Sequence, residues 1–283
     1  MPLSITLDWL AMTFKEDTRE LQDFCNLYAR AEKVNDEPAR NGYNSASKDA
    51  NGVVCMWHTD RAEMGYHVIF AGSALRNVFE RLGVSQRDLV KAARNAGGHF
   101  TRLDLAKDAQ DVPINLGSIW EHIERKEYQA FTRTFSTITN QDGARTIYMG
   151  SRQSERFARI YDKLAQLGLQ KGHWYRYELE TKGMVARALA ALLVGEANWA
   201  GAFDSMALGM VDIPKSRDYR AFFADGEVLV GIPKIERSTD REAWIQNQVI
   251  KAVIVHFVEY PDSPAVALLF EALKFNMSHR GRD

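Results

Sequence analysis

His99-Phe-Thr-Arg-Leu-Asp-Leu-Ala-Lys-Asp108 is the stretch from which the fold can be worked out. Polar and apolar residues alternate in it, a pattern typical of a β-strand that buries one face. The helix that we expect from Ser85 to Ala96 ends at Gly97-Gly98, just before this strand. The alternation places four residues on one face of the strand: Arg102, Asp104, Ala106 and Asp108.

A similar strand opens the chain, and the similarity indicates a duplication. The segment from Ser4 to Phe14 contains Leu7-Asp8-Trp9, which resembles Leu103-Asp104-Leu105. A second similarity links Ile69-Phe-Ala-Gly-Ser73 with Ile147-Tyr-Met-Gly-Ser151. Repeated segments of this kind predict that one structural unit occurs twice. We therefore expect a strand–helix–strand–strand unit in each half of the chain, and two sheets related by a pseudo-two-fold axis.

The order of the expected elements defines the fold class and three regions. Residues 1–98 and 99–214 each form a sheet-and-helix half, and residues 215–283 form a C-terminal region with a hairpin at 222–232 and helices at 241–260 and 264–277. Residues 37–51 are expected to be a loop, and little can be assigned at 198–214. Strands grouped before helices are typical of an α+β protein.

The composition restricts the classes of function. The chain has 283 residues, 46% of them hydrophobic, with 36 basic and 37 acidic residues and a formal net charge of −1. A globally cationic nucleic-acid binder is therefore excluded, and any DNA-binding surface must come from local segregation of charge. Cys25 and Cys55 have no CxxC spacing, so neither a zinc site nor a disulfide is indicated. We expect no signal peptide, no membrane span and a cytoplasmic location.

Carboxylates on two strands indicate a metal site. In Trp174-Tyr-Arg-Tyr-Glu-Leu-Glu-Thr181, alternation puts Arg176, Glu178 and Glu180 on one face. If this strand lies beside the 99–108 strand, Asp104 meets one or both glutamates. Oxygen ligands of this kind suit Mg²⁺ or Mn²⁺. The alternative is an ordinary solvated sheet face on which Arg102 and Arg176 form cross-strand ion pairs with the carboxylates.

The segment Gly150-Ser-Arg-Gln-Ser-Glu-Arg-Phe-Ala-Arg-Ile-Tyr-Asp-Lys163 is locally cationic. After a turn at Gly150, we expect Ser151, Arg152 and Ser154 to bind phosphate. Alternation then places four residues on one face: Phe157, Arg159, Tyr161 and Lys163. We expect the two cations to favour a phenolate at Tyr161 that attacks a phosphodiester. The alternative is a packing tyrosine, and Tyr148 and Tyr177 are rival nucleophiles.

These segments resemble the replication initiation factor family of plasmid and phage rolling-circle initiators and conjugative-element relaxases. The resemblance rests on the 150–163 segment and Tyr175-Arg-Tyr-Glu-Leu-Glu-Thr-Lys182, supported by 65–76 and 102–108. It covers about residues 4–190, and no segment dedicated to origin recognition can be assigned.

The resemblance implies a fold, a reaction and the residues that perform it. It implies two fused sheets in a saddle-like arrangement and a 5′-phosphotyrosyl link that leaves a free 3′-hydroxyl. Tyr161 would be the nucleophile, aided by Arg159 and Lys163, and the metal ligands would be Asp104 and Glu178, with Glu180 and Asp108 as further candidates. We also expect Arg102 and Arg176 to contact DNA.

The partners implied are single-stranded DNA or an extruded origin hairpin, a second copy of the chain in a homodimer and a host helicase, in the cytoplasm of a bacterium. The first half, with Asp8 but no counterpart of Tyr161, would be a non-catalytic copy that helps to hold DNA. Two alternative functions are open: a metal-dependent polymerase or primase palm, and a non-enzymatic DNA-binding regulator.

Overall fold

The computed structural model describes residues 3–15, 17–29, 35–141, 143–169, 171–195 and 198–223. The chain divides into two compact units, Met1–Ile232 and Pro233–Asp283. The helices expected at 241–260 and 264–277 and most of the hairpin expected at 222–232 lie outside the described residues. Within those residues, no helix is both long enough and apolar enough to cross a membrane.

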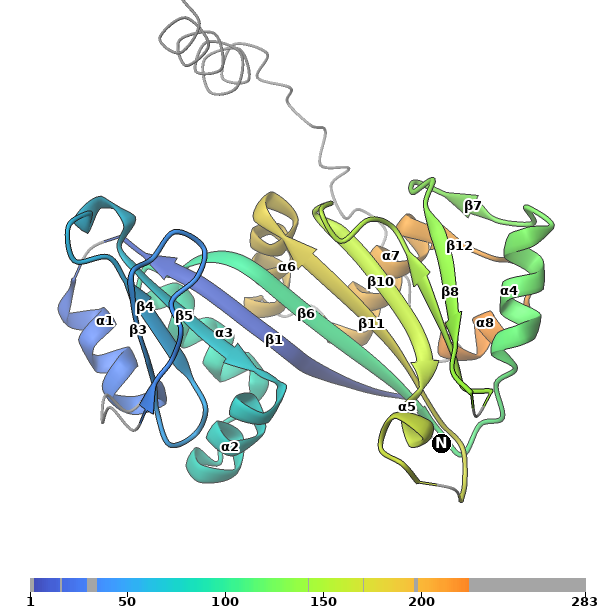
Figure 1. Ribbon diagram of the computed structural model, residues 1–283, viewed down its shortest axis with the longest axis horizontal. Coiled ribbons are helices and arrows are strands. Elements are labelled where there is room, and N and C mark those ends of the chain that lie inside the picture. The colour runs from blue at the N-terminus through green and yellow to red at the C-terminus, as the bar shows by residue number, and fades with distance from the viewer. Residues whose placement is uncertain are drawn as a thin grey trace, which may run out of the picture. The chain divides into compact units, whose positions relative to one another are not determined.

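The centre of the fold is one antiparallel sheet, in the order β2-β3-β4-β5-β1-β6-β11-β10-β9-β8 (Figure 1). The strands of the first half are β1 (Ser4–Phe14), β2 (Asn35–Asp36), β3 (Ser45–Lys48), β4 (Val54–Trp57) and β5 (Tyr66–Ala71). Those of the second half are β6 (His99–Gln110), β8 (Phe135–Thr139), β9 (Arg145–Met149), β10 (Arg156–Asp162) and β11 (Trp174–Lys182). A separate two-stranded sheet pairs β7 (Gln129–Ala130) with β12 (Val211–Asp212).

The two halves meet along β1 and β6. These strands run antiparallel over most of their length, with Leu7 opposite Leu105 and Leu10 opposite Leu103. Main-chain hydrogen bonds thus continue from one half to the other, and the two separate sheets that we expected are a single sheet. The predicted α+β class with duplicated antiparallel halves is confirmed.

The duplication is visible in the topology, but one of its two sequence similarities is coincidental. The strand beside β1 is β5, and it leads directly into α2 (Gly72–Leu82); the strand beside β6 is β11, and it leads directly into α6 (Gly183–Val194). The counterpart of the Gly72 region is therefore the Gly183 region. The Gly150 region, which we had paired with it, follows β9 instead, two strands away from β11.

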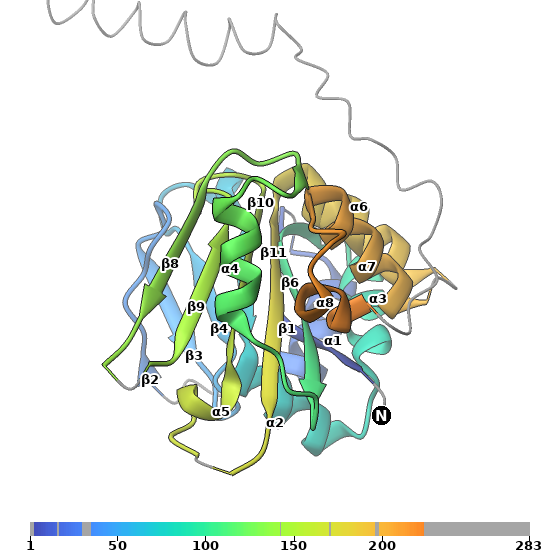
Figure 2. The ribbon, with the colours of Figure 1, turned by 90° about the vertical axis from the view of Figure 1, so that its right-hand side faces the viewer.

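Helices cover one face of the sheet. Among them are α2, α6, α3 (Gln86–Asn95), α7 (Trp199–Met210) and α8 (Arg217–Arg220), which lie on the same side of the strands (Figure 2). Their apolar side chains pack against the sheet and include the fully buried Val78, Leu89, Leu189 and Phe203. The opposite face is called the open face below.

Further helical segments complete the described part of the chain. They are α1 (Arg19–Phe24) with the π-helical turn Cys25–Ala29, the 3-10 turns Ala62–Met64 and Ala221–Phe223, α4 (Leu116–Glu124) and α5 (Lys163–Gln166). Thr18 caps α1, because its Oγ1 accepts a hydrogen bond from Leu21 N at 3.2 Å.

One local expectation was wrong, and the unassigned stretch contains a helix. The stretch expected to be a loop at 37–51 contains β3, and the unassigned stretch at 198–214 contains α7. Helix α2 begins at Gly72, and its N-cap is Ala71, which makes no side-chain capping bond, so Ser73 lies inside the first turn.

Candidate active site

The predicted acidic and basic side chains gather on the open face, on three adjacent strands. The register places Glu180 opposite Asp104, Arg176 opposite Asp108, and Arg159 opposite Glu178. The other face of the same strands looks toward the helices, as Tyr177 shows by packing edge-on against Phe203 of α7. The alternation expected for both strands is thus confirmed.

Arg102 joins two of the carboxylates. Its Nε lies 3.0 Å from both carboxylate oxygens of Asp104, and its Nη2 donates to Glu180 at 2.8 Å. The guanidinium also stacks on the Trp9 ring, 4.5 Å from the ring centre. Lys182 adds a second cation to Glu180 at 2.7 Å. Burial dominates at Asp104 and raises its pKa to about 7, although Arg102 acts in the opposite direction.

Arg176 forms the second cluster. Its Nε and Nη2 donate to the two oxygens of Asp108, each at 2.7 Å, a bidentate geometry that orients both groups. Trp174 Nε1 donates to the same carboxylate at 2.7 Å. Both Arg102 and Arg176 are therefore occupied by the protein's own carboxylates, and their expected contact with DNA stays a prediction.

Tyr161, Glu178 and Arg159 form the third cluster. The Tyr161 hydroxyl donates to Glu178 Oε1, while Arg159 donates to Oε2 of the same carboxylate. Tyr161 is only 6% exposed. Arg159 and Lys163 lie over its ring, 5.9 and 5.7 Å from the ring centre.

The expected phenolate at Tyr161 is not supported. Burial, followed by the negative charge of Glu178 and the hydrogen bond to it, raises the pKa of the phenol above its ordinary value of 10.0. Arg176 and Arg159 lower it by less. The group is therefore a neutral phenol whose proton already points at a carboxylate.

The two rival tyrosines differ in position. Tyr148 of β9 lies directly opposite Arg159, is half-buried and stacks on Phe157 with ring centres 5.9 Å apart. Tyr177 is completely buried on the helix side. Tyr148 therefore shares the open face with Tyr161, and Tyr177 does not.

The loop before β10 carries the expected phosphate-binding residues. Gly150 has a φ of +91°, and a Cβ there would lie 2.8 Å from Met210 Cε, so the turn expected at this glycine is confirmed. Ser154 Oγ lies 2.7 Å from the Ser151 carbonyl oxygen, and Ser151 Oγ accepts from the Gln153 amide at 3.2 Å. Arg152 is exposed and extends over Phe157, 5.2 Å from its ring centre.

The expected metal centre stays a prediction. Asp104, Glu178 and Glu180 have the oxygen chemistry that Mg²⁺ and Mn²⁺ prefer, but no group of three or more potential ligands comes close enough together in the described part of the chain. Each carboxylate is instead matched by a guanidinium, which is the ion-pair alternative stated above.

Asp8 belongs to the candidate site, although the sequence analysis placed this residue in a non-catalytic copy. The register of β1 against β6 skips one residue between Leu7 and Trp9, and this β-bulge contains Asp8. Its Oδ1 lies 3.3 Å from Arg176 Nη1, and burial together with Glu178 raises its pKa. The similarity of Leu7-Asp8-Trp9 to Leu103-Asp104-Leu105 was the available signal, and it was interpreted only as a trace of duplication.

Comparison with known proteins gives two sequence matches. Residues 98–227 match the family model described as "Replication initiation factor". A putative DNA relaxase, NicK of Bacillus subtilis (strain 168), is 32% identical over 120 residues, which covers 38% of this chain and 34% of that protein. The matched stretch is thus about a third of the relative's length.

A solved structure shows the fold. A rolling-circle replication initiator protein from Geobacillus stearothermophilus superposes with a TM-score of 0.65, at 18% sequence identity, over 77% of this chain and 91% of that chain. This chain therefore shares its fold with that initiator. The predicted resemblance to the replication initiation factor family is confirmed, and residues 98–227 are the part of the chain that carries it.

Proposed function

We propose that this protein nicks one strand of DNA by transesterification, with Tyr161 as the nucleophile. The observation that carries the proposal is the hydrogen bond from the Tyr161 hydroxyl to Glu178, whose other oxygen is held by Arg159. A nucleophile bonded to a base that is itself oriented by a third group is the general arrangement for covalent catalysis.

In the proposed step, the phenolic oxygen forms a bond to phosphorus and the bond from phosphorus to the 3′ oxygen breaks. Glu178 takes the phenolic proton, and the departing 3′ oxygen takes up a proton from solvent. The products are a 5′-phosphotyrosyl link and a free 3′-hydroxyl. Arg159 and Arg176 would stabilise the charge that develops on the phosphoryl oxygens.

Access to Tyr161 supports the proposal. The residue lines a cavity of about 250 Å³, together with Arg159, Arg145, Tyr148 and others. Two cations and a tyrosine pair in one hollow suit a phosphodiester with its neighbouring base. In-line attack needs a single-stranded or extruded site, because the phosphodiester of an intact duplex is poorly placed for it.

The remaining expectations about this reaction are part of the proposal. Dependence on Mg²⁺ or Mn²⁺, with Asp104, Glu178 and Glu180 as ligands, is expected from the family, and no step above is routed through the ion. Lys163, which donates to Gln166 Oε1 at 2.6 Å, is proposed to assist, and Ser151, Arg152 and Ser154 are proposed to hold phosphate. A homodimer, a host helicase partner and a bacterial cytoplasm stay predictions.

The decisive test is capture of the covalent intermediate. The full chain is incubated with a labelled single-stranded origin oligonucleotide and Mn²⁺, and adducts are resolved by denaturing electrophoresis. We expect an adduct with the unmodified protein and with the Tyr177→Phe control, and none with Tyr161→Phe. An adduct of unchanged yield from Tyr161→Phe, lost instead in Tyr148→Phe, would transfer the role to Tyr148.

The same assay separates the alternatives. A polymerase or primase palm would incorporate nucleotides on a template and form no adduct. A non-enzymatic regulator would bind the oligonucleotide equally well after Asp104→Ala and Glu178→Ala. It would not cleave the oligonucleotide, whichever metal ion is added.

A further inference from the structure

A pocket of about 650 Å³ lies on the open face of the first half, next to the candidate active site. Its described lining comes from four adjacent strands and the loop before β3, and includes Trp9, Arg40, Tyr43, His67, Thr101 and Lys182. The volume falls in the range of about 300–1,000 Å³ that is typical of sites for small organic groups.

The wall of the pocket is aromatic and held rigidly. Tyr43 stacks on His67 with ring centres 5.7 Å apart and planes inclined by 22°. The Tyr43 hydroxyl donates to the Met64 carbonyl oxygen at 3.3 Å, and His67 Nδ1 lies 2.9 Å from Thr13 Oγ1. Both rings are therefore fixed at a second point, which lowers the entropy lost when a flat ligand stacks on them.

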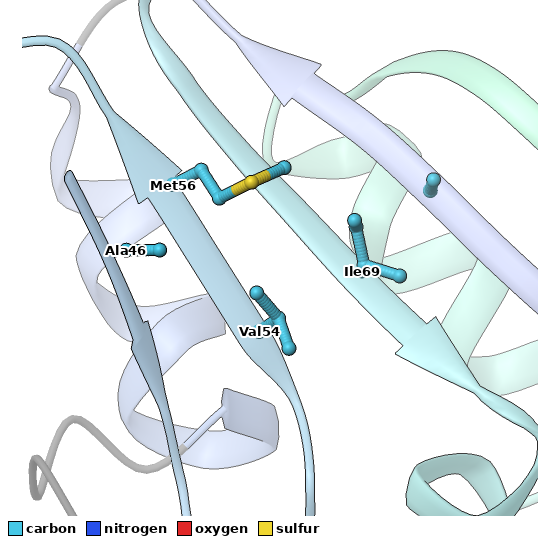
Figure 3. Packing of buried hydrophobic residues seen from close by; sticks show 5 residues of the cluster. Ala46, Val54, Met56 and Ile69 are labelled. Atoms are coloured by element: carbon cyan, nitrogen blue, oxygen red, sulfur yellow. The ribbon is translucent and has the colours of Figure 1, made fainter. Parts of the chain in front are cut away.

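A buried apolar cluster supports this wall. Figure 3 shows it across β3, β4 and β5, where Ala46, Val54, Met56 and Ile69 point toward one another. Trp9 and Tyr43 pack against the cluster from its edge. The aromatic side chains of the pocket are thus supported by a packed apolar cluster. This cluster is distinct from the core on the helix side of the sheet.

Two polar atoms of the lining residues have no partner. Trp9 Nε1 and Thr101 Oγ1 are buried and make no hydrogen bond with any described residue. Buried polar atoms nearly always have a partner in folded proteins. Both atoms belong to side chains that line the pocket.

The charge of the pocket favours an anion. Its described lining contains the cations Arg40, Arg102 and Lys182 and no carboxylate. Arg40 is exposed and has no acidic partner within the described residues. Arg102 and Lys182 also bind Glu180, so they connect the pocket with the candidate active site.

We propose that this pocket holds one nucleotide of the single strand that is nicked, with its base against Tyr43 and Trp9 and its phosphate at Arg40. Aromatic platforms interleaved with cations are the general means by which proteins bind single-stranded nucleic acid. Trp9 lies three strands across the sheet and about four residues along it from Tyr161. The usual spacings of strands and residues in a sheet make this a distance of roughly 20 Å. A few nucleotides span that gap. This inference rests on the proposed function for the identity of the strand.

The test measures binding and chemistry separately on the full chain. Affinity for fluorescein-labelled oligo(dT) is measured by fluorescence anisotropy, and adduct formation is measured at saturating origin oligonucleotide. We expect Tyr43→Ala to raise the Kd about 5- to 150-fold, because stacking of a base is worth about 1–3 kcal/mol. Arg40→Ala should raise the Kd and lower the slope of log Kd against log salt by about one. Neither should change the adduct yield at saturation.

The matched controls lie elsewhere on the same half. Tyr66 is an exposed tyrosine of β5 adjacent to His67, and Arg94 is an exposed arginine of α3 on the helix side. Tyr66→Ala and Arg94→Ala should leave the Kd unchanged. Because Arg40 is exposed, its replacement also reports on the pocket if Tyr43→Ala fails to fold.

Photo-cross-linking locates the base directly. Oligo(dT) carrying 5-iododeoxyuridine is irradiated with the Tyr161→Phe protein, and cross-linked peptides are mapped by mass spectrometry. Cross-links to Trp9, Tyr43 or His67 support the pocket. Cross-links confined to other segments, or an unchanged Kd in both Tyr43→Ala and Arg40→Ala, overturn it. If the unmodified protein forms no adduct while the effects of the pocket variants on the Kd are present, the nicking reaction alone is overturned.

Discussion

Charged side chains are buried away from water in this protein, and the buried Lys107 has an oppositely charged partner. Lys107 extends from β6 toward the helices, and its Nζ lies 2.5 Å from Asp204 Oδ1 of α7. Both side chains are only 1% exposed, and the rings of Phe203 and Phe223 lie near the ammonium group, at 5.8 and 5.5 Å. A buried pair of this kind fixes how the helix and the sheet meet, whether or not it adds net stability.

Lys107→Met is expected to destabilise the fold by about 3–5 kcal/mol, because it removes one partner of a buried ion pair. The double variant Lys107→Met with Asp204→Leu should recover most of that loss, since neither charge is then buried. Urea unfolding of both variants and the unmodified chain measures the difference. A double variant as unstable as Lys107→Met would show that the loss comes from packing.

His67 predicts a pH dependence of stability. Burial, reinforced by the charge of Arg40, lowers the pKa of His67 to about 4. The unfolded chain therefore binds a proton near pH 6.5 that the folded chain does not, so stability is lost as the pH falls from about 6.5 to about 4. His67→Asn should lose less stability over this interval, by up to about 3 kcal/mol.

The difference between the two unfolding curves isolates His67 from other groups that titrate in the same range. Asp104 is one of them: burial raises its pKa to about 7, so it acts with the opposite sign, and stability falls as the pH rises from about 4 to 7. Identical pH profiles for the unmodified chain and His67→Asn would contradict the assignment.

At this scale, sequence alternation placed the side chains on the correct face but could not show their pairing. Which arginine meets which carboxylate depends on the register of β6, β11 and β10, and no pattern within one strand contains that information. Asp8 was missed for the same reason, because a bulge interrupts the alternation from which faces are inferred.

At the scale of helices and strands, some tight turns between elements need a glycine. Gly65 joins the 3-10 turn at Ala62–Met64 to β5 with a φ of +69° and a ψ of −163°, a region that only glycine enters readily. A Cβ at this position would lie 2.1 Å from the Phe14 carbonyl oxygen. The turn and the end of β1 therefore approach each other as closely as backbone atoms allow.

Gly65→Ala should destabilise the protein by about 3 kcal/mol, at the upper end of the usual range for single substitutions. Gly83→Ala is the matched control, because Gly83 also has a positive φ, +63°, but a Cβ there meets nothing within 4 Å. It should cost only the left-handed strain of about 1–2 kcal/mol. Equal losses in chemical unfolding would show that the contact with Phe14 does not matter.

The elements that the sequence failed to predict share a property: their support comes from distant residues. Strand β3 is polar and short, and it is a strand because β4 pairs with it. Helix α7 is apolar on most sides, so it lacks the amphipathic periodicity that predicts a helix, and its burial against the sheet stabilises it. Strands β6 and β11 were predictable from the alternation in their sequences, and β1 from its β-branched and aromatic residues.

For the molecule as a whole, the two halves are not independent. The family match covers residues 98–227, yet β6 within it is paired along β1, which supplies the buried Leu7, Leu10 and Met12. The charge network crosses the same boundary through Asp8 and Arg176. The first half therefore contributes both to the core and to the candidate site of the second.

A fragment of residues 98–223 is expected to lack a cooperative unfolding transition, because β6 would expose an unpaired edge and apolar side chains. Circular dichroism during urea unfolding, with the full chain as reference, tests this. A fragment that unfolds in one sharp transition and still forms the DNA adduct would show that the second half is self-sufficient.

The unbroken run of main-chain hydrogen bonds through β1 and β6 has a mechanical consequence. A continuous hydrogen-bonded sheet resists bending more than two domains joined by a linker, so we expect the two halves to move as one body. If DNA binds as proposed, entry of the DNA strand would then depend on local movements. Arginine side chains would exchange their carboxylate partners for phosphate, and loops at the edge of the sheet would shift.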